Sequence, residues 1–280
     1  HAAGSDRIVP ISACVVAAPD LIDALPSLAE LIPLAASRSS EVRLTLTLTE
    51  GGVDVAVEGA KELDGPGRAL LAGAANRAGL ARLSWNGEPA VTRRPPHVAM
   101  GRAKVTPPPG GFLQATADGA AALVAAVREA VAGAGAIADL FAGSGTFSLP
   151  LAEDAEIHAV ESQAEALDAL DRGWREAPGL KRITTERRDL AHRPLRPEEL
   201  TRFDAVVVDP PRAGARLQAE HLAKSGVARI AMVSCNPATF ARDARLLIDG
   251  GFGLDWVKPV DQFRWSAHVE LAAQFTRAHR

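Results

Sequence analysis

The chain has two cysteines, and one of them, Cys235, stands where a thiol could act as a nucleophile. It follows the apolar run 229–233, and Asn236-Pro237 comes next, a pair that commonly opens a helix. We expect the N-terminus of that helix to favour the thiolate, the reactive form of cysteine. The alternative is that Cys235 is a small apolar packing residue, the usual role of a buried cysteine.

A second stretch that could serve chemistry is Asp139-Leu-Phe-Ala-Gly-Ser-Gly-Thr146, between an apolar run and a helix-like segment. Gly143 and Gly145 permit positive φ, so the backbone can turn sharply and approach a ligand closely. A dinucleotide fingerprint needs a third glycine at position 148, where this chain has Ser148. Two glycines behind an acidic strand end favour S-adenosylmethionine, which carries no phosphate. An ordinary turn is the alternative.

Acidic residues follow four successive apolar runs, at Asp139, Glu161, Asp189 and Asp209. Glu161 lies 22 positions beyond Asp139, where a carboxylate could accept hydrogen bonds from both ribose hydroxyls. Asp189 could accept from an adenine amino group. Each acid alone could be a helix cap or a solvated strand end. Their recurrence after four strands favours a shared ligand site.

The elements that would hold these residues alternate between strand and helix from residue 116 onward. Strands are predicted at 136–138, 157–160, 183–185, 205–208 and 229–233, with helices near 118–131, 163–175, 215–224 and 238–248. Two further strands should lie within 252–275. This pattern predicts an α/β fold with a Rossmann-like, doubly wound sheet, which binds ligands at the carboxyl ends of its strands.

Residues 1–115 are predicted to form a smaller mixed α/β domain, followed by the catalytic domain at 116–280. Alternating runs flank Gly51-Gly52 and Asn86-Gly87, which indicates two β-hairpins. The proline-rich stretch 107–111 is typical of a domain edge. The first residue is His1, and we expect an upstream portion to precede it.

Composition limits the possible partners. The net charge of −3 gives no overall attraction to nucleic acid, so RNA contacts would come from local groups such as Arg187-Arg188, or from a part of the protein outside this chain. There is no apolar run of membrane-spanning length, no signal peptide and no cysteine–histidine cluster with metal-ligand spacing. We therefore expect a cytoplasmic monomer with no membrane partner and no catalytic metal.

Four motifs occur in a familiar order. They are Asp-Leu-Phe-Ala-Gly-Ser-Gly-Thr146, Asp209-Pro-Pro-Arg-Ala-Gly, Ser-Cys235-Asn-Pro-Ala-Thr-Phe-Ala-Arg-Asp243 and Ala267-His-Val-Glu270. With them the chain resembles the RNA 5-methyluridine methyltransferases, S-adenosylmethionine-dependent enzymes of transfer and ribosomal RNA. The resemblance is strong over about residues 111–275, and the earlier residues resemble the central domain of that family.

The resemblance implies a role for each site residue. Cys235 would add to carbon-6 of the uracil ring, and Glu270 would remove the proton from carbon-5. The methyl donor would be surrounded by Gln114, Phe141, Glu161, Asp189 and Asp209. Thr146 joins this donor set, although many members have asparagine there. Several members bind an iron–sulfur cluster through a cysteine at the position of Cys14, but one cysteine cannot hold a cluster, so we expect a structural role for it.

Three other functions fit parts of the sequence. Amino-methyltransferases use a stiff turn similar to Asp209-Pro-Pro-Arg212, and such an activity would leave Cys235 dispensable. A nicotinamide-dependent oxidoreductase would share the fold, but Ser148 in place of glycine speaks against it. A non-catalytic RNA-binding module would not need both Cys235 and Glu270.

Overall fold

The computed structural model describes residues 5, 7, 9, 11, 13–36 and 41–277. The chain divides into two compact units. The first extends to Val98 and includes Thr106–Gly110, and the second comprises Ala99–Val105 and the chain from Gly111 onward. The boundary between residues 115 and 116, as a division into independently folding domains, stays a prediction.

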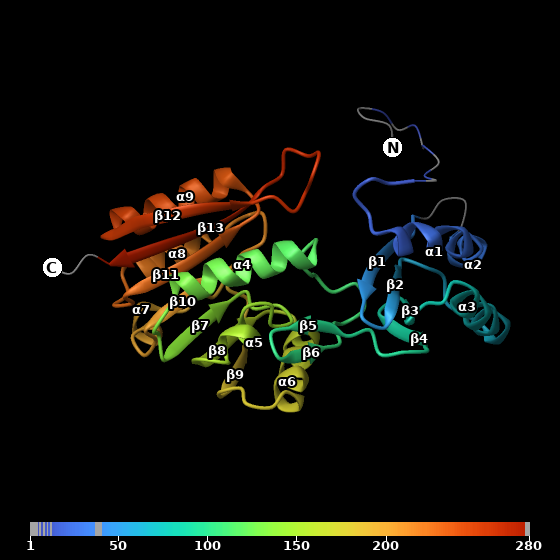
Figure 1. Cartoon of the computed structure of the whole chain (residues 1–280), viewed down its shortest axis with the longest axis horizontal. Coiled ribbons are helices and arrows are strands. Elements are labelled where there is room, and N and C mark those ends of the chain that lie inside the picture. Colours follow the sequence, from blue (N-terminus) through green and yellow to red (C-terminus); the bar gives the residue numbers. More distant parts are fainter. Residues whose placement is uncertain are drawn as a thin grey trace. The chain divides into compact units, whose positions relative to one another are not determined.

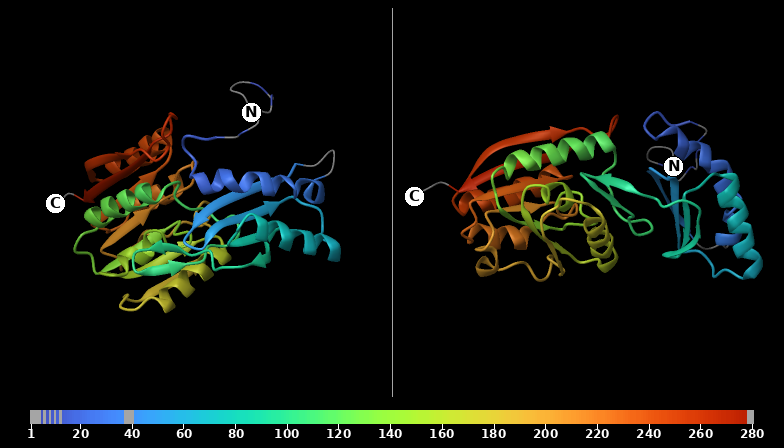
Figure 2. Two further views of the ribbon diagram at one scale, coloured as in Figure 1. Left: turned by 45° about the vertical axis from the view of Figure 1, so that its right-hand side comes forward. Right: turned by 60° about the horizontal axis from the view of Figure 1, so that its bottom comes forward.

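The first unit is built on a four-stranded sheet. Its strands lie in the order β1 (Arg43–Thr49), β2 (Gly52–Glu58), β3 (Arg82–Trp85) and β4 (Glu88–Thr92). Helices α1 (Pro19–Ala29) and α3 (Gly65–Arg77) pack against one face, and α2 (Ile32–Ala35) follows α1 (Figure 2). The pairs β1–β2 and β3–β4 are antiparallel, so both predicted hairpins are confirmed.

Cys14 precedes α1 and is exposed. Its sulfur accepts a hydrogen bond from the backbone N–H of Ala17 at 3.4 Å. Hydrogen bonds from the backbone of Val16 and Ala17 lower the pKa of this thiol. Cys14 therefore packs into no core of the described residues, and its structural role stays a prediction.

The second unit contains a seven-stranded sheet in the order β12-β13-β11-β10-β7-β8-β9 (Figure 1). The parallel strands are β7 (Ala136–Leu140), β8 (Glu156–Glu161), β9 (Ile183–Arg187), β10 (Ala205–Val208) and β11 (Arg229–Ser234). Strand β13 (Glu270–Arg277) runs antiparallel to both of its neighbours, β11 and β12 (Phe252–Val260). The strand order reverses between β7 and β10, and such a switch point opens a ligand crevice. The predicted doubly wound sheet and its two closing strands are confirmed.

Helices cover both faces of this sheet. On one face lie α4 (Ala117–Ala130), α5 (Ser148–Leu151) and α6 (Ala164–Glu176), together with the short hairpin of β5 (Val98–Met100) and β6 (Ala103–Val105). On the other lie α7 (Pro197–Leu200), α8 (Arg216–Ala223) and α9 (Pro237–Asp249). Burial from both sides explains why β10 is an uninterrupted apolar run. Among the described helices, none has the length and apolar character needed to cross a membrane.

Candidate active site

The carboxyl ends of the parallel strands bring the predicted residues to one edge of the sheet. Phe141 follows β7, Glu161 closes β8, and Asp209 follows β10. This arrangement results from the parallel pairing of β8, β7 and β10, which aligns the ends of all three strands. Residues far apart in the sequence are thus gathered around the switch point.

Cys235 and Glu270 meet at the same edge. Ser234, the last residue of β11, pairs with Leu271 of β13. The next residue after Ser234 is Cys235. Because β13 runs antiparallel to β11, the residue opposite Cys235 is the one before Leu271, which is Glu270. The charge of Glu270 raises the pKa of the Cys235 thiol, in agreement with this proximity. A thiol and a carboxylate therefore face the same space.

The loop after β7 has the conformation that its glycines predict. Gly143 has a φ of +54° and Gly145 a φ of +101°, and Phe141 also adopts a positive φ of +64°. A Cβ atom on Gly145 would lie 2.9 Å from Leu149 Cδ1 and 3.0 Å from Leu170 Cγ. A larger residue at position 145 would thus push the loop away from α5 and α6.

Ser148 occupies the position of the missing third glycine, and it has a partner that the sequence did not reveal. Its hydroxyl donates a hydrogen bond of 2.6 Å to Asp139 Oδ2. Both residues are fully buried, and Asp139 Oδ1 has no hydrogen-bond partner among the described residues. Burial raises the pKa of Asp139 to about 7. Such a carboxyl group would gain from a cationic ligand placed nearby.

Glu161 combines a structural contact with a free acceptor position. Its Oε1 accepts hydrogen bonds from the backbone N–H of Ser162 at 2.6 Å and of Gln163 at 2.9 Å, at the start of α6. Its Oε2 accepts from Gly143 N at 3.2 Å. The carboxylate is thereby held against the glycine loop. Oε1 also accepts a hydrogen bond from Ser162 Oγ at 2.8 Å, so the acceptor position that is open to a ligand is on Oε2.

A chain of amide and acid side chains joins Asp209 to Glu270. Gln114 Nε2 lies 3.4 Å from Asp209 Oδ2, and Gln114 Oε1 accepts a hydrogen bond of 2.8 Å from Gln262 Nε2. A hydrogen bond from Gln262 also lowers the pKa of Glu270, although burial raises it more. Burial, followed by the charges of Glu270 and Asp139, raises the pKa of Asp209 to about 8. Gln262 was missed in the sequence, which shows no pattern around it.

The expected activation of Cys235 by a helix N-terminus is wrong, because the pKa of this thiol is raised and not lowered. Burial raises the pKa of this thiol, and the charges of Glu270 and Asp209 raise it further. The reason is local: Cys235 precedes the N-cap residue Asn236, whose side chain accepts from Ala238 N at 3.1 Å. The thiol therefore lies outside the first turn of α9 and beside two acids.

Two predicted donor residues stand apart from this network. Asp189 is exposed, and it accepts hydrogen bonds from Ala191 N at 3.0 Å and His192 Nδ1 at 2.8 Å. Hydrogen bonding to His192 lowers its pKa. Thr146 is half-buried in the glycine loop. Neither contributes to the raised pKa values of Asp139, Asp209 or Cys235.

The chemistry of this group of residues fits a cationic methyl donor. A sulfonium carries positive charge and needs no phosphate site. Asp139 on β7 and Asp209 after β10 have pKa values that are raised by burial. The unpartnered oxygen of Asp139 gives the same indication. The thiol and carboxylate of Cys235 and Glu270 lie beside that region, where a second reactant could be held.

Comparisons with known proteins point in one direction. A family model described as tRNA (Uracil-5-)-methyltransferase matches residues 108–278. An uncharacterized RNA methyltransferase from Brucella suis is 46% identical over 276 residues, 99% of this chain and 66% of that protein. The 23S rRNA (uracil(1939)-C(5))-methyltransferase RlmD from Chromohalobacter salexigens is 33% identical, over 99% of this chain and 60% of the relative. The chain thus spans about two thirds of the length of these relatives.

A solved structure shares the fold. It is the Pyrococcus abyssi tRNA (uracil-54, C5)-methyltransferase in complex with S-adenosyl-L-homocysteine, which superposes with a TM-score of 0.77. The sequences are 24% identical, and the match covers 96% of this chain and 69% of the other. At this identity the likeness concerns the fold, and it agrees with the Rossmann-like sheet described above.

Proposed function

The chain belongs to the tRNA (uracil-5-)-methyltransferase family, and we propose that it transfers a methyl group from S-adenosylmethionine to carbon-5 of a uridine in transfer or ribosomal RNA. The family match confirms the resemblance drawn from the sequence motifs. The observation that carries the proposal is the juxtaposition of Cys235 and Glu270 where β11 and β13 pair. Covalent activation of uracil needs both a thiol nucleophile and a base.

The donor site is formed by Gln114, Phe141, Thr146, Glu161, Asp189 and Asp209. Glu161 accepts from the ribose hydroxyls, and Asp189 accepts from the adenine amino group. The bound donor supplies an electrophilic methyl group on a sulfonium. The raised pKa values of Asp139 and Asp209 support a cationic ligand beside them, since a positive charge favours their ionised forms.

Cys235 is the nucleophile. Its thiolate forms a bond to carbon-6, and the electrons of the carbon-5 to carbon-6 double bond move into the ring as an enolate. Carbon-5 then takes the methyl group, whose bond to sulfur breaks with both electrons remaining on the sulfur. Positive charge beside Asp209 and Glu270 offsets their negative charges, and so it lowers the pKa of the thiol when it is needed as a thiolate.

Glu270 is the base of the second half-reaction. It removes the proton from carbon-5, the double bond forms again, and the Cys235 thiolate leaves carbon-6. Burial raises the pKa of Glu270, and a carboxylate with a raised pKa is a stronger base near neutral pH. The target uridine has to leave its stack to reach Cys235, because carbon-6 is covered by neighbouring bases in a helix.

The product of the reaction tests this proposal. The protein is incubated with bulk RNA and isotopically labelled methyl donor, the RNA is digested to nucleosides, and the label is located by mass spectrometry. We expect the label in 5-methyluridine. Label in a nucleoside methylated on an exocyclic nitrogen would contradict the proposal and favour an amino-methyltransferase. The cytoplasmic location and the monomeric state stay predictions.

A further inference from the structure

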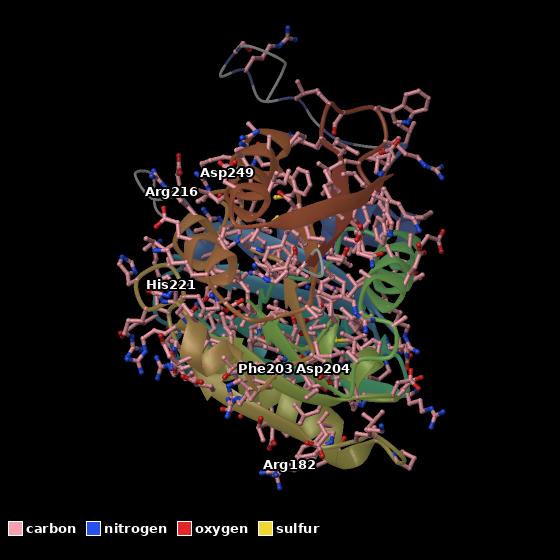
Figure 3. All side chains as sticks on the ribbon, turned by 90° about the vertical axis from the view of Figure 1, so that its left-hand side faces the viewer. Arg182, Phe203, Asp204, Arg216, His221 and Asp249 are labelled. Atoms are coloured by element: carbon pink, nitrogen blue, oxygen red, sulfur yellow. The ribbon has the colours of Figure 1, made fainter. Side chains whose placement is uncertain are left out.

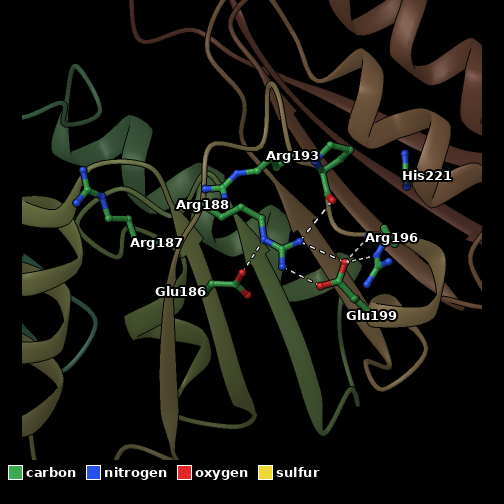
Figure 4. A pocket seen from close by; sticks show the side chains of 8 residues that line it. Glu186, Arg187, Arg188, Arg193, Arg196, Glu199 and His221 are labelled. Atoms are coloured by element: carbon green, nitrogen blue, oxygen red, sulfur yellow. Dashed lines mark hydrogen bonds and ion pairs between the residues drawn. The ribbon is translucent and has the colours of Figure 1, made fainter.

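A hollow of about 420 Å³ lies between the end of β9, the loop 188–196 and helices α7 and α8 (Figure 4). The residues that line it are Glu186, Arg187, Arg188, Arg193, Pro194, Arg196, Glu199 and His221. Its wall thus carries four arginines and two glutamates, although the whole chain has a net charge of −3. Positive charge is therefore concentrated locally, in a space of the size that holds a ligand group.

Arg188 forms ion pairs with both glutamates of the wall. Its Nε lies 2.6 Å from Glu186 Oε1, and its Nη2 lies 2.7 Å from Glu199 Oε1. Arg188 also lowers the pKa of Glu199 to about 2, so this carboxylate stays ionised and paired. The paired groups are largely shielded from solvent, with 19% of the Arg188 side chain exposed. These three side chains form an ion-paired floor of the hollow.

The pocket lining has four arginines and only two glutamates, so not every arginine can pair with an acid of the lining. Arg187 donates from Nε to the carbonyl oxygen of Ser162 at 3.2 Å, and Arg196 shares Glu199 at 3.3 Å. Within the part of the chain that the structure describes, Arg187 and Arg193 have no carboxylate partner. His221 Nδ1, in the same lining, is also buried with no hydrogen-bond partner among the described residues. Guanidinium groups without carboxylates suit a phosphate, which accepts two parallel hydrogen bonds.

We propose that this arginine pocket, defined by the eight residues above, binds a backbone phosphate of the RNA substrate. The inference rests on the proposed function for the identity of the ligand. Arg187, the last residue of β9, lies at the carboxyl-end edge of the sheet, as Cys235 does after β11. The opposite wall of the pocket, on α7 and the last turn of α8, lies nearer the amino ends of β10 and β11. Four strand spacings separate β9 from β11, which is about 19 Å. One RNA strand can reach both places, with the phosphate a few nucleotides from the target uridine.

The test compares Arg193→Gln and Arg187→Gln with Arg182→Gln as the matched control. Arg182 is exposed and precedes the opposite end of β9, and Figure 3 shows it pointing away from the molecule. Binding of bulk transfer RNA and of ribosomal RNA fragments is measured from about 50 to 200 mM salt. Each pocket variant should bind roughly three- to tenfold more weakly and reduce the slope of log affinity against log salt by about 0.7–0.9. The control should match the unsubstituted protein.

Two further measurements make the outcome decisive. Affinity for S-adenosylhomocysteine should be unchanged in all three variants, which shows that the donor site is folded. Unchanged RNA affinity and salt slope in both pocket variants would overturn the proposal. The proposal would also be overturned if the pocket variants lost affinity only for inorganic phosphate or uridine monophosphate and not for RNA, because the site would then bind a free anion. If RNA binding depends on the pocket but no 5-methyluridine forms, the pocket stands and the proposed reaction fails.

Discussion

Gln262 Nε2 donates a hydrogen bond of 2.8 Å to Gln114 Oε1, which joins the loop before β13 to the segment before α4. Gln262 is 7% exposed, and a Cβ on Gly119 would lie 2.4 Å from its Oε1, so only glycine admits this side chain. A hydrogen bond from Gln262 also lowers the pKa of Glu270. One amide group therefore touches both the proposed donor site and the proposed base.

We predict that Gln262→Met slows product release more than it slows methyl transfer. Methionine has a similar volume but donates no hydrogen bond, so the pKa of Glu270 should rise. Glu270 must be deprotonated to act, and the acid limb of the pH profile for release should therefore move to higher pH. Single-turnover kinetics between pH 5.5 and 9 measure this. Gln274→Met, on β13, is the control, and an unshifted profile for Gln262→Met would rule out the positioning role.

Binding of the methyl donor should depend on pH. The pKa values of Asp209 and Asp139 are raised to about 8 and about 7, so at neutral pH both carboxyl groups hold protons for a large part of the time. A cationic sulfonium favours their ionised forms, and binding should therefore release protons. Affinity should rise from pH 6 to pH 8 and level off above about pH 8.

Calorimetry in two buffers of different ionisation enthalpy counts the protons released. S-adenosylhomocysteine is the matched ligand, because it lacks the sulfonium charge and should show a weaker dependence. Equal pH dependence for the two ligands would mean that neither acid responds to the sulfonium. Asp209→Asn should flatten the profile for S-adenosylmethionine in particular.

Glu161→Ala should weaken donor binding at least tenfold. Loss of hydrogen bonds to a charged group costs about 1.5–3 kcal/mol each, and this carboxylate is expected to hold two ribose hydroxyls. Glu161 also accepts from the start of α6, so the variant should lose some stability as well. Glu165→Ala, an exposed change in the first turn of α6, controls for helix effects. Calorimetric affinity equal to that of the unsubstituted protein would remove Glu161 from the donor site.

The sequence predicted those features that depend on short segments. Gly143 and Gly145 need positive φ because of the turn they form, and acids at strand ends meet because parallel strands share a direction. The sequence therefore predicts Glu161 at the end of one strand and Cys235 just past the end of another, and the structure places them there.

Features that depend on distant contacts were missed or wrong. The pKa of Cys235 is raised by burial and by the charge of Glu270. Glu270 lies on β13, 35 residues further along the chain. The role of Gln262 depends on its hydrogen bond to Gln114, which lies on a distant segment of the same unit. In the sequence Ser148 stands only for a missing glycine, and its hydrogen bond to Asp139 forms only in the folded turn. Such effects follow from tertiary packing, which local patterns do not encode.

Glu270→Gln should separate the two halves of the reaction. Glutamine cannot accept the carbon-5 proton, so methyl transfer should proceed and release should slow by roughly 10²–10⁴-fold. The variant should accumulate a methylated protein–RNA adduct that survives denaturing electrophoresis. Turnover at the unsubstituted rate with no adduct would place the base elsewhere, with Asp209 or a bound water as the next candidate.

The covalent bond between Cys235 and RNA is the most direct test of the central claim. RNA containing 5-fluorouridine is incubated with the protein and S-adenosylmethionine, and the linked residue is identified by mass spectrometry. Fluorine cannot leave carbon-5 as a proton does, so the adduct should persist on Cys235. Cys14→Ala, a change of the other, exposed cysteine, should form the adduct normally, whereas Cys235→Ala should form none and should lose methylation. A Cys235→Ala protein that still produces 5-methyluridine would contradict the account.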